Sequence, residues 1–440
     1  MYFKKVICFT MAMALFSVSV CASPRLPADP ETGWITISKC SGGAEKVMSA
    51  IPSNYGDVVT SYLYANNDNT FSVVDYSNNT INIDTYNSQT YEWIKNKKIA
   101  MELPLFGGVY CGSKYNFIVF GQNNTTENDN TVTFKTVKYS KNWEKIGVVD
   151  YSNNNTIKPF EAGSLRMVEH DNYLYVRSCH QMYKSSDGFN HQSNITYSIN
   201  IDKMEIADEY SGVMNDDYGY VSHSFDQYIA IDDGKLVALD LGDAYPRSVV
   251  LIKYNDSLNK GKFTNSNGLC TVVDMLEISG NTGDNYTGVT IGGFEASKNN
   301  YIAAISTIDQ KTKSSARDIM LLIVNKKDTS KVKQVRITKY ANTEKGDSAS
   351  KPYIVKLPDG NYQIIWQTFS KEGGFYGIQQ VTVDENGTML TDITTLGSAR
   401  LSPDCQPICI NNKIVWYTDT INANNELERS FYKLDIPYKK

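Results

Sequence analysis

The amino-acid sequence predicts an all-β fold, a β-propeller with seven blades of four antiparallel strands each. Three observations lead to this prediction. Short apolar runs recur about every 57 residues, helical periodicity is almost absent, and clusters of Asn, Asp, Gly and Ser separate the runs. A repeat of this length with several short strands in each unit is typical of propeller blades.

Seven continuous apolar runs set the repeat. The runs are FSVV, FIVF, YLYV, LVAL, YIAAI, YQIIW and KIVWY, and they begin near residues 71, 117, 173, 236, 301, 362 and 413. Continuous runs suit strands that neighbouring sheets cover on both faces. The Asp-Lys and Glu-Asn-Gly steps that follow are typical of hairpins, because these residues tolerate positive φ.

An inner strand can be assigned before six of these runs. The assigned segments are GGVYC, SLRMVEH, YVSHSFDQYIAI, GVTIGGF, PYIVKL and QPICI. The last unit ends early, so we expect GWITISK (33–39) to supply its missing strand and leave no unpaired edge. The helical spacing in GGAEKVMSAI predicts a short helix near 43–51. Two stacked all-β domains are the alternative fold, but no linker or shift in composition divides the chain, which favours one domain over 23–440.

The first 22 residues have the three parts of a signal peptide. Lys4 and Lys5 precede an apolar run from Val6 to Val20, and small residues follow it. The run is shorter than the ~20 residues of a membrane-spanning helix, so we expect no transmembrane anchor. The predicted location is secreted or cell-surface. Lipidation of Cys21 is the competing interpretation, and the bulky Val20 argues against it.

Charge and cysteine content narrow the class of partner. Asp and Glu number 48 against 43 Lys and Arg, so nucleic acid and anionic membrane are not expected partners.

Six cysteines follow the leader, an even number that predicts three disulfides in an exported protein without fixing their pairing. They are Cys40, Cys111, Cys179, Cys270, Cys405 and Cys409. No metal-binding spacing occurs, so we expect no metal and no cofactor. We also expect a monomer.

Candidate site residues fall on the loops that would share one face of the propeller. These loops lead into the inner strand or join the second strand to the third, and loops on a rigid scaffold commonly carry function. The predicted ligand-binding residues are Arg177, His180, His223, Asp243, Tyr245, Arg247, Arg400 and Asp404, and Arg166 starts another inner strand on this face.

Two functional interpretations follow, and a third is weaker. The first is binding of an extracellular glycan or protein on this face. The second is a carbohydrate-active hydrolase or lyase in which His180 or His223 acts with a loop carboxylate such as Asp243. Nucleophilic catalysis by Ser224 is excluded, because adjacent strand residues point to opposite faces. A purely adhesive protein is the third, and the lack of an attached anchor domain counts against it.

Two resemblances accompany this interpretation. The stretch SSDGFNH, with Ser185, Asp187 and Gly188, resembles the Asp-box turn of sialidase-like propellers, although His191 stands where that motif has Trp. The segments YVRSCHQMYKSSDGFNHQ, GYVSHSF, GDAYPR and ARLSPDCQP resemble secreted bacterial propeller modules of uncharacterised function. The first resemblance implies a β-blade, the second implies an extracytoplasmic propeller, and neither implies a catalytic residue.

Overall fold

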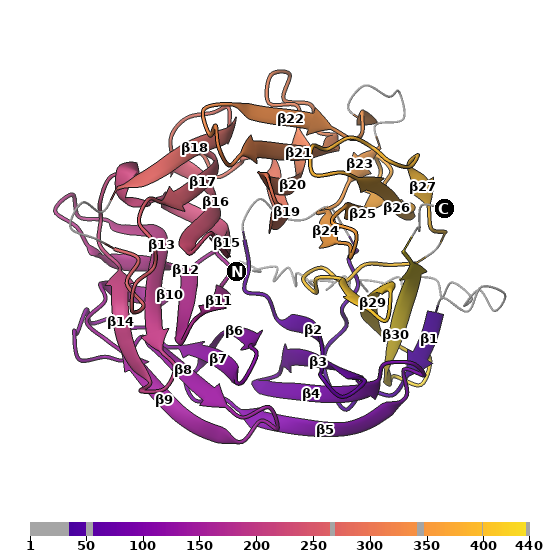
Figure 1. Ribbon diagram of the computed structural model, residues 1–440, viewed down its shortest axis with the longest axis horizontal. Helices are drawn as coiled ribbons and strands as arrows, with labels where there is room; N and C mark the ends of the chain where they lie inside the picture. Colours follow the sequence, from indigo (N-terminus) through magenta and orange to yellow (C-terminus); the bar gives the residue numbers. More distant parts are fainter. Residues whose placement is uncertain (1–34, 50–55, 265–268, 341–346, 398, 437–440) are drawn as a thin grey trace, which may run out of the picture.

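The chain forms a ring of antiparallel sheets. The computed structural model describes residues 35–49, 56–264, 269–340, 347–397 and 399–436. Figure 1 shows the sheets arranged in a ring, with the strands of each sheet following one another from the centre outward. The described residues contain one turn of 3-10 helix, η1 (Asp216–Tyr218), and no α-helix. The all-β propeller class predicted from the sequence is confirmed.

Five sheets are separate blades of four or five strands. The first blade comprises β2 (Ser61–Ala65), β3 (Thr70–Ser77), β4 (Thr80–Asn87) and β5 (Trp93–Ala100). The second comprises β6 (Leu105–Cys111), β7 (Asn116–Gly121), β8 (Phe134–Tyr139) and β9 (Lys145–Tyr151). Another comprises β19 (Val289–Ala296), β20 (Asn300–Ile308), β21 (Arg317–Asn325) and β22 (Val332–Arg336). The next comprises β23 (Ser348–Ala349), β24 (Tyr353–Lys356), β25 (Tyr362–Phe369), β26 (Phe375–Val383) and β27 (Thr394–Thr395). The last comprises β28 (Ile408–Ile410), β29 (Lys413–Ile421), β30 (Leu427–Asp435) and β1 (Ile35–Ser38).

The remaining sheet has nine strands. Its strands are β10 (Thr156–Pro159), β11 (Arg166–His170), β12 (Tyr173–Lys184), β13 (Asn190–Asn200), β14 (Glu205–Tyr210), β15 (Ser222–Asp232), β16 (Lys235–Tyr245), β17 (Ser248–Tyr254) and β18 (Cys270–Glu277). A single residue pair, Ser193 with Ser222, joins β13 to β15.

The prediction of seven separate four-stranded blades is therefore wrong in its count. The chain forms five separate blades, and the nine-stranded sheet occupies the rest of the ring. The physical reason is strand length: β12 has 12 residues, and β13, β15 and β16 have 11 each. Strands this long extend beyond the usual span of a blade, so the ends of β13 and β15 meet and share a ladder. Nothing in the apolar pattern marks where a strand of this kind stops.

All seven apolar runs lie in the second strand from the centre of a sheet, as the sequence analysis assumed. These strands are β3, β7, β12, β16, β20, β25 and β29. Every residue of β7 and of β20 is buried, because neighbouring sheets cover both faces of these strands. The continuous runs therefore form the cores between adjacent sheets.

Gly-Gly pairs shape the narrow inner edge of the ring. In β6 the pairing register shifts between Phe106 and Gly108, and in β19 it shifts between Ile291 and Gly293. A Cβ atom on Gly292 would lie 1.8 Å from the main-chain oxygen of Pro352, which excludes any larger residue there. These bulges let the inner strands approach the centre closely.

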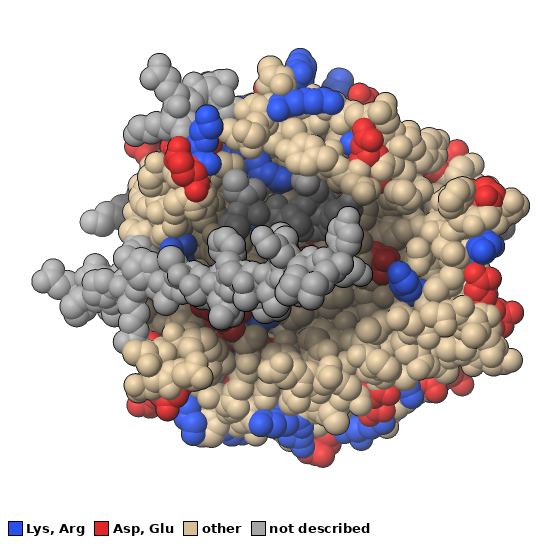
Figure 2. Space-filling view, turned by 180° about the vertical axis from the view of Figure 1, so that it is seen from behind, with Lys and Arg blue, Asp and Glu red and all other residues tan. Residues whose placement is uncertain are grey.

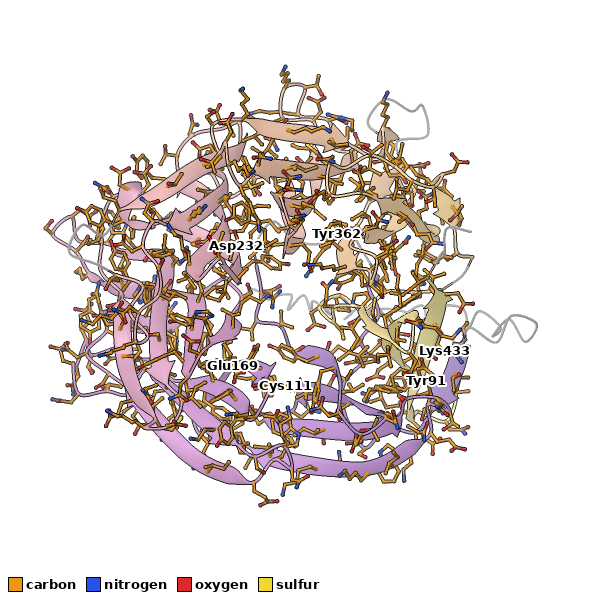
Figure 3. The ribbon with its side chains drawn as sticks, viewed as in Figure 1. Tyr91, Cys111, Glu169, Asp232, Tyr362 and Lys433 are labelled. Atoms are coloured by element: carbon orange, nitrogen blue, oxygen red, sulfur yellow. The ribbon has the colours of Figure 1, made fainter. Side chains whose placement is uncertain are left out.

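The N-terminal strand closes the ring. β1 lies within the predicted segment 33–39 and pairs antiparallel with β30, from Ile35 opposite Tyr432 to Ser38 opposite Arg429. An aromatic cluster fills the joint between the last and first blades, with the ring centroids of Phe71 and Phe431 5.0 Å apart. Lys433 of β30 lies 4.9 Å above the ring of Tyr91 in the first blade (Figure 3).

The helix predicted near 43–51 is wrong for the residues that are described, because 43–49 are not helical. The backbone of Lys46 donates to Asp419 and that of Met48 donates to Leu401, at 2.9 and 2.8 Å. Met48 is buried in the core of the last blade. Long-range main-chain hydrogen bonds thus hold this segment extended in spite of its helical spacing.

Buried charges connect the last blade to the first. Arg429 is fully buried and forms two hydrogen bonds to Asp419, of 2.8 and 2.6 Å, and it also contacts Asp84 at 3.3 Å. Asp75 lies in the same joint, and neither of its carboxylate oxygens has a hydrogen bond within the described residues. Burial raises the pKa of Asp75 to about 7, although Lys46 and Arg429 oppose the shift.

We expect the Asp75→Asn variant to remove a specific pH dependence of stability. Folded Asp75 keeps its proton up to about pH 7, whereas an unfolded aspartate releases it near pH 4. The wild type should therefore lose stability as the pH rises from about 4 to 7, by about 1.4 kcal/mol for each unit of pKa difference at most. Urea unfolding from pH 4 to pH 8 measures this loss, and Asp75→Asn should show a smaller one. The exposed Asp202→Asn is the control, and equal slopes in all three proteins would contradict the assignment.

Candidate functional site

Arg177 does not lie on the predicted face. It is fully buried in the middle of β12, and its guanidinium donates to Asp240 of β16 at 2.8 and 2.6 Å. Its remaining terminal nitrogen donates to the Thr196 hydroxyl at 2.8 Å. The sequence placed Arg177 at a strand end, but β12 continues for seven residues beyond it. Arg177 therefore connects the two halves of the nine-stranded sheet and cannot contact a ligand.

His180 is also buried, so its prediction as a ligand or catalytic residue is wrong. Its Nδ1 lies 2.6 Å from the Thr156 hydroxyl, inside the pairing of β10 with β12. Burial lowers the pKa of His180 to about 3, which keeps the imidazole neutral. A buried neutral ring with no access to solvent cannot exchange protons with a substrate.

The structure brings His223 and Asp243 together as the sequence analysis expected. His223 Nδ1 lies 2.9 Å from a carboxylate oxygen of Asp243, and Asp243 is fully buried. His223 has a φ of 53° where the register of β15 shifts between Ser222 and Ser224. About a third of the imidazole remains exposed. The carboxylate thus orients the imidazole through Nδ1, and a partly exposed imidazole held in this way has the arrangement of a general base.

Arg247 and Tyr245 lie beside this pair but differ in what they can do. Arg247 donates to the main-chain oxygens of Asp243 and Asp284, at 2.6 and 2.8 Å, and also to those of Ser279 and Tyr286. Its guanidinium therefore fastens the loop before β19. Tyr245 is 54% exposed, with its hydroxyl 3.4 Å from Asp216. Of the two, only Tyr245 has a side chain free to meet a ligand.

Arg400 and Asp404, the remaining predicted residues, have different surroundings. The Arg400 guanidinium lies 3.5 Å from the ring centre of Phe375. Asp404 accepts hydrogen bonds from the Thr60 amide, the Thr60 hydroxyl and the Ser61 hydroxyl, at 2.8, 2.7 and 2.7 Å. Burial opposes ionisation, but nearby Lys46 and these hydrogen bonds hold the pKa of Asp404 below its usual value. Asp404 is an ionised group at the centre of the ring.

A pocket of about 270 Å³ opens among the inner strands, and we call it the central pocket. Figure 2 shows the ring hollowed at its centre. Residues from β2, β11, β15, β19 and β24 line the pocket, together with the segment before β28. Its charged lining residues are Arg166, Glu295, Lys351 and Asp404, and its aromatic ones are Tyr62, Tyr228, Phe294 and Tyr353. Of the predicted ligand-binding residues, only Asp404 lines it.

Two cations of the central pocket rest on aromatic rings. The Arg166 guanidinium lies 4.8 Å from the ring centre of Tyr228, and Lys351 Nζ lies 5.7 Å from that of Tyr353. Neither cation forms an ion pair with a carboxylate in the part of the chain that the structure describes. Asp226 is the nearby acid: burial raises its pKa, and Lys351 and Arg166 lower it. The sequence analysis placed Arg166 on this face but overlooked Lys351, which no motif distinguishes.

Acids at the opposite end of the inner strands already have partners. The Ser113 amide donates to Glu169 of β11 at 3.0 Å, and the Tyr301 hydroxyl donates to Asp232 of β15 at 2.6 Å (Figure 3). Glu295 also lines the pocket, and burial raises its pKa to about 7 while Lys356 opposes the shift. The charged lining of the central pocket therefore includes both cations and acids.

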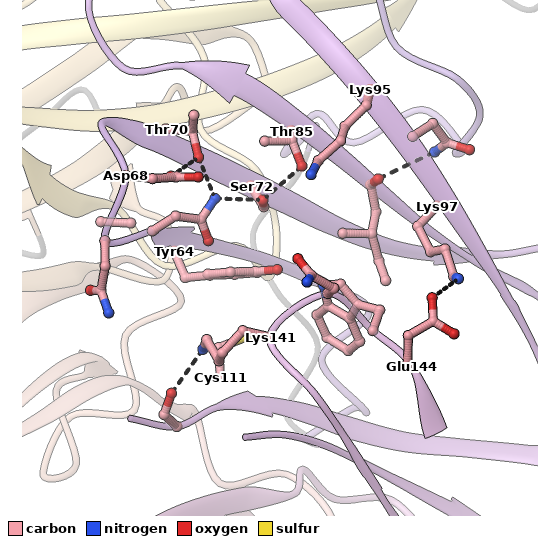
Figure 4. Close-up of a pocket in the computed structure, with 18 of the residues that line it drawn as sticks. Tyr64, Asp68, Thr70, Ser72, Thr85, Lys95, Lys97, Cys111, Lys141 and Glu144 are labelled. Carbon is pink, nitrogen blue, oxygen red and sulfur yellow. Dashed lines mark hydrogen bonds and ion pairs between the residues drawn. The ribbon is translucent and has the colours of Figure 1, made fainter. Parts of the chain in front are cut away.

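A larger pocket of about 680 Å³ lies between the first two blades (Figure 4). Its charged groups are mostly paired: Lys97 contacts Glu144 at 2.8 Å, and Lys141 donates to Gly112 and Asn116 at 2.8 Å each. The turns that form it lie on the face opposite the predicted loops. This pocket is larger than the central pocket, but the central pocket combines charged groups with aromatic walls among the inner strands.

The SSDG turn is an ordered hairpin connection between β12 and β13. Asp187 accepts from the Ser185 hydroxyl at 2.5 Å and from the Phe189 amide at 3.0 Å, and it contacts His191 at 2.7 Å. These hydrogen bonds lower the pKa of Asp187 to about 2. The bonds are internal to the turn, so it has a local structural role.

The six predicted disulfide cysteines are all free thiols. Cys40, Cys111, Cys179 and Cys270 lie in different parts of the ring, and Cys405 and Cys409 are not bonded to each other. An even cysteine count predicted disulfides, but packing of the sheets has placed these side chains singly. Burial raises the pKa of Cys111 to about 12, which keeps that thiol protonated.

Comparisons with known proteins find similarity of structure only. No family model and no curated protein matches the chain. Hydrazine synthase of Kuenenia stuttgartiensis is 11% identical, with a TM-score of 0.42 over 89% of this chain and 98% of that one. A protein of Bacteroides fragilis assigned as a 6-phosphogluconolactonase is 12% identical, with a TM-score of 0.43 over 84% and 97%. A GH43 β-1,3-galactosidase with galactodeoxynojirimycin is 11% identical, with a TM-score of 0.33 over 66% and 94%.

The described residues lack two features. They contain no helix with the length and hydrophobicity needed to cross a bilayer. They also hold no group of three or more His, Cys, Asp or Glu side chains placed to bind a metal ion.

Substitution of Arg177 should affect stability rather than binding. Removing one partner of a buried pair leaves the other charge unpaired, so Arg177→Met should lower the free energy of unfolding by about 3–5 kcal/mol. The double variant Arg177→Met/Asp240→Leu should recover much of that loss, because no buried charge remains. Denaturant unfolding measures both effects. A fully stable Arg177→Met protein would contradict the structural role.

Proposed function

We propose that this chain is an exported β-propeller that binds an extracellular ligand, a glycan or a protein, at the central pocket. The observation that carries the proposal is the pair of cations, Arg166 and Lys351, held over tyrosine rings at a pocket with aromatic walls. Inner strands from around the ring converge on them, so the scaffold fixes their positions rigidly. Ligand pockets commonly combine aromatic walls with a few well-placed polar groups.

The export part of the proposal rests on the leader. Residues 1–22 have the basic start, apolar middle and small-residue end of a signal peptide, and they lie outside the described residues. Secretion or display at the cell surface gives the pocket access to extracellular ligands. The six free thiols do not support an oxidised framework, so export is argued from the leader alone.

Binding at the central pocket should depend on Tyr228. Screening on a glycan array and a panel of extracellular proteins, followed by titration calorimetry, should find a ligand. Tyr228→Ala should weaken its binding roughly tenfold, which corresponds to about 1.4 kcal/mol, because the variant removes an aromatic wall and the support of Arg166. Tyr376→Ala is the control, since Tyr376 is 58% exposed and does not line the pocket. Loss of binding in Tyr376→Ala with retention in Tyr228→Ala would place the ligand elsewhere.

The second candidate function is a carbohydrate-active hydrolase or lyase that uses His223. The observation that favours it is the contact of the partly exposed His223 imidazole with buried Asp243, which engages Nδ1. In this reaction Nε2 would take a proton from water or from a sugar carbon while Nδ1–H donates to Asp243. The strained backbone of His223 is consistent with a functional position.

A comparison of two histidine variants separates an enzyme from a binding protein. If the chain is an enzyme, wild type should release reducing ends or unsaturated products from a polysaccharide panel, and His223→Ala should lose roughly 100-fold or more of the rate. His170→Ala is matched as a control, because the side chains of His170 and His223 are 33% and 34% exposed. Equal activity of both variants, or no product from wild type on any polysaccharide, would reject the catalytic role.

A further inference from the structure

We propose that Asp75 and Asn82 bind a divalent cation of the calcium type in the joint between the first and last blades. The site lies where the segment that follows β1 crosses β3 and β4 of the first blade. It goes beyond the proposed function, because it does not depend on any ligand in the central pocket.

Asp75 and Asn82 face each other across β3 and β4. They are paired residues in the antiparallel register, so their side chains lie on the same face of the sheet with Cβ atoms about 5 Å apart. Asp75 is 1% exposed and Asn82 is 5% exposed. Both carboxylate oxygens of Asp75 and Oδ1 of Asn82 are buried without a hydrogen bond among the described residues. Buried oxygens of this kind are costly unless a hydrogen-bond donor or a cation meets them.

The charge around these oxygens is negative. Arg429 donates twice to Asp419 and contacts Asp84 at 3.3 Å. Lys46 lies 3.8 Å from Asp404, and its hydrogen bond goes to a threonine hydroxyl. Both cations act through space on the carboxylate of β3, but neither forms an ion pair with it within the described residues. The joint therefore holds two cations and four carboxylates, and the excess of two negative charges matches a divalent cation. The six groups are Lys46, Arg429, Asp75, Asp84, Asp404 and Asp419.

The segment 39–49 brings its main chain against both side chains. A Cβ atom on Gly43 would lie 3.2 Å from Asp75 Oδ1, and one on Gly42 would lie 3.2 Å from Asn82 Oδ1. Glycine permits this close approach because it has no side chain. Main-chain carbonyls and water commonly complete the ligand shell of Ca²⁺, so a main chain at this distance suits such a site.

The available ligands favour calcium among the common cations. They are carboxylate and amide oxygens, which hard cations prefer. Ca²⁺ accepts an irregular shell of oxygens, whereas Mg²⁺ requires a nearly regular octahedron. The site differs from a group of three or more His, Cys, Asp or Glu side chains, which the described residues lack, because an amide and the main chain take part. With one carboxylate as a direct ligand, we expect a Kd of about 0.1–1 mM.

Calcium titration of the full chain tests the site. The protein is treated with a chelator, dialysed and titrated with CaCl₂ at pH 8, above the pKa of Asp75. Tetramethylammonium chloride keeps the ionic strength constant. Calorimetry should show binding at one site in the range of about 0.1–1 mM, and Ca²⁺ should raise the Tm by a few degrees. MgCl₂ should bind roughly tenfold more weakly or less.

Two variants and one control locate the cation. Asp75→Asn keeps the shape of the side chain and removes its charge, so it should lower Ca²⁺ affinity about tenfold or more and abolish the rise in Tm. Asn82→Ala removes the amide oxygen and keeps the carboxylate, and it should weaken binding roughly threefold to tenfold. Asp202→Asn, which changes an exposed acid, should bind as the wild type does. Asn82→Ala remains informative if Asp75→Asn does not fold.

Three other outcomes would overturn this assignment. Full Ca²⁺ affinity in Asp75→Asn and Asn82→Ala would place the cation elsewhere. Equal stabilisation by Na⁺, K⁺ and Ca²⁺ would reject a divalent site. No binding of Ca²⁺ up to about 10 mM would show that the two side chains hold no cation of this class. The proposed function would survive each of these results, because its own test uses Tyr228→Ala.

Discussion

The closure of the ring is the constraint on which the other features of this structure depend. The strand β1, from the N-terminal part of the chain, completes the last blade by pairing with β30, so both ends of the described chain lie in one sheet. Arg429 then ties the last blade to the first through Asp419 and Asp84. With the ring closed, the inner strands have to converge, and the Gly-Gly bulges of β6 and β19 make that convergence possible. The central pocket is the space that this convergence leaves.

Much of the architecture could be predicted from the sequence, because it rests on apolar pattern and turn chemistry. All seven apolar runs lie in second strands, and the segment 33–39 contains the closing strand. The number of separate blades could not be predicted, since the link between β13 and β15 depends on how far two long strands extend. The segment 43–49 shows the same limit, because long-range hydrogen bonds of Lys46 and Met48 override its helical spacing.

The candidate site was less predictable, because residue type does not reveal burial or partners. His223 and Asp243 come together because neighbouring strands β15 and β16 place them so, and pattern alone could suggest this. Arg177 and His180 are also of residue types that bind ligands or catalyse reactions. In this fold, however, Arg177 forms a buried ion pair and His180 is a neutral core histidine. Lys351 precedes a proline in a segment without a recognisable motif. It lines the central pocket only because β24 converges there with β11 and β15.

Arginines in this fold differ in what surrounds them. Arg177 and Arg429 join long strands or whole blades, and each has an aspartate that satisfies its fork of donors. Pairs of this kind fix which strands lie together, because a misplaced partner would leave a buried charge unpaired. Arg166 lies at the inner edge, where it lines the central pocket, and the buried acid Asp226 acts on it without forming an ion pair among the described residues. The face of Tyr228 and the nearby Asp226 offset part of the cost of placing a cation there. Because no aspartate holds both arms of its guanidinium, Arg166 keeps its polar end at the pocket, where the proposed binding site uses it.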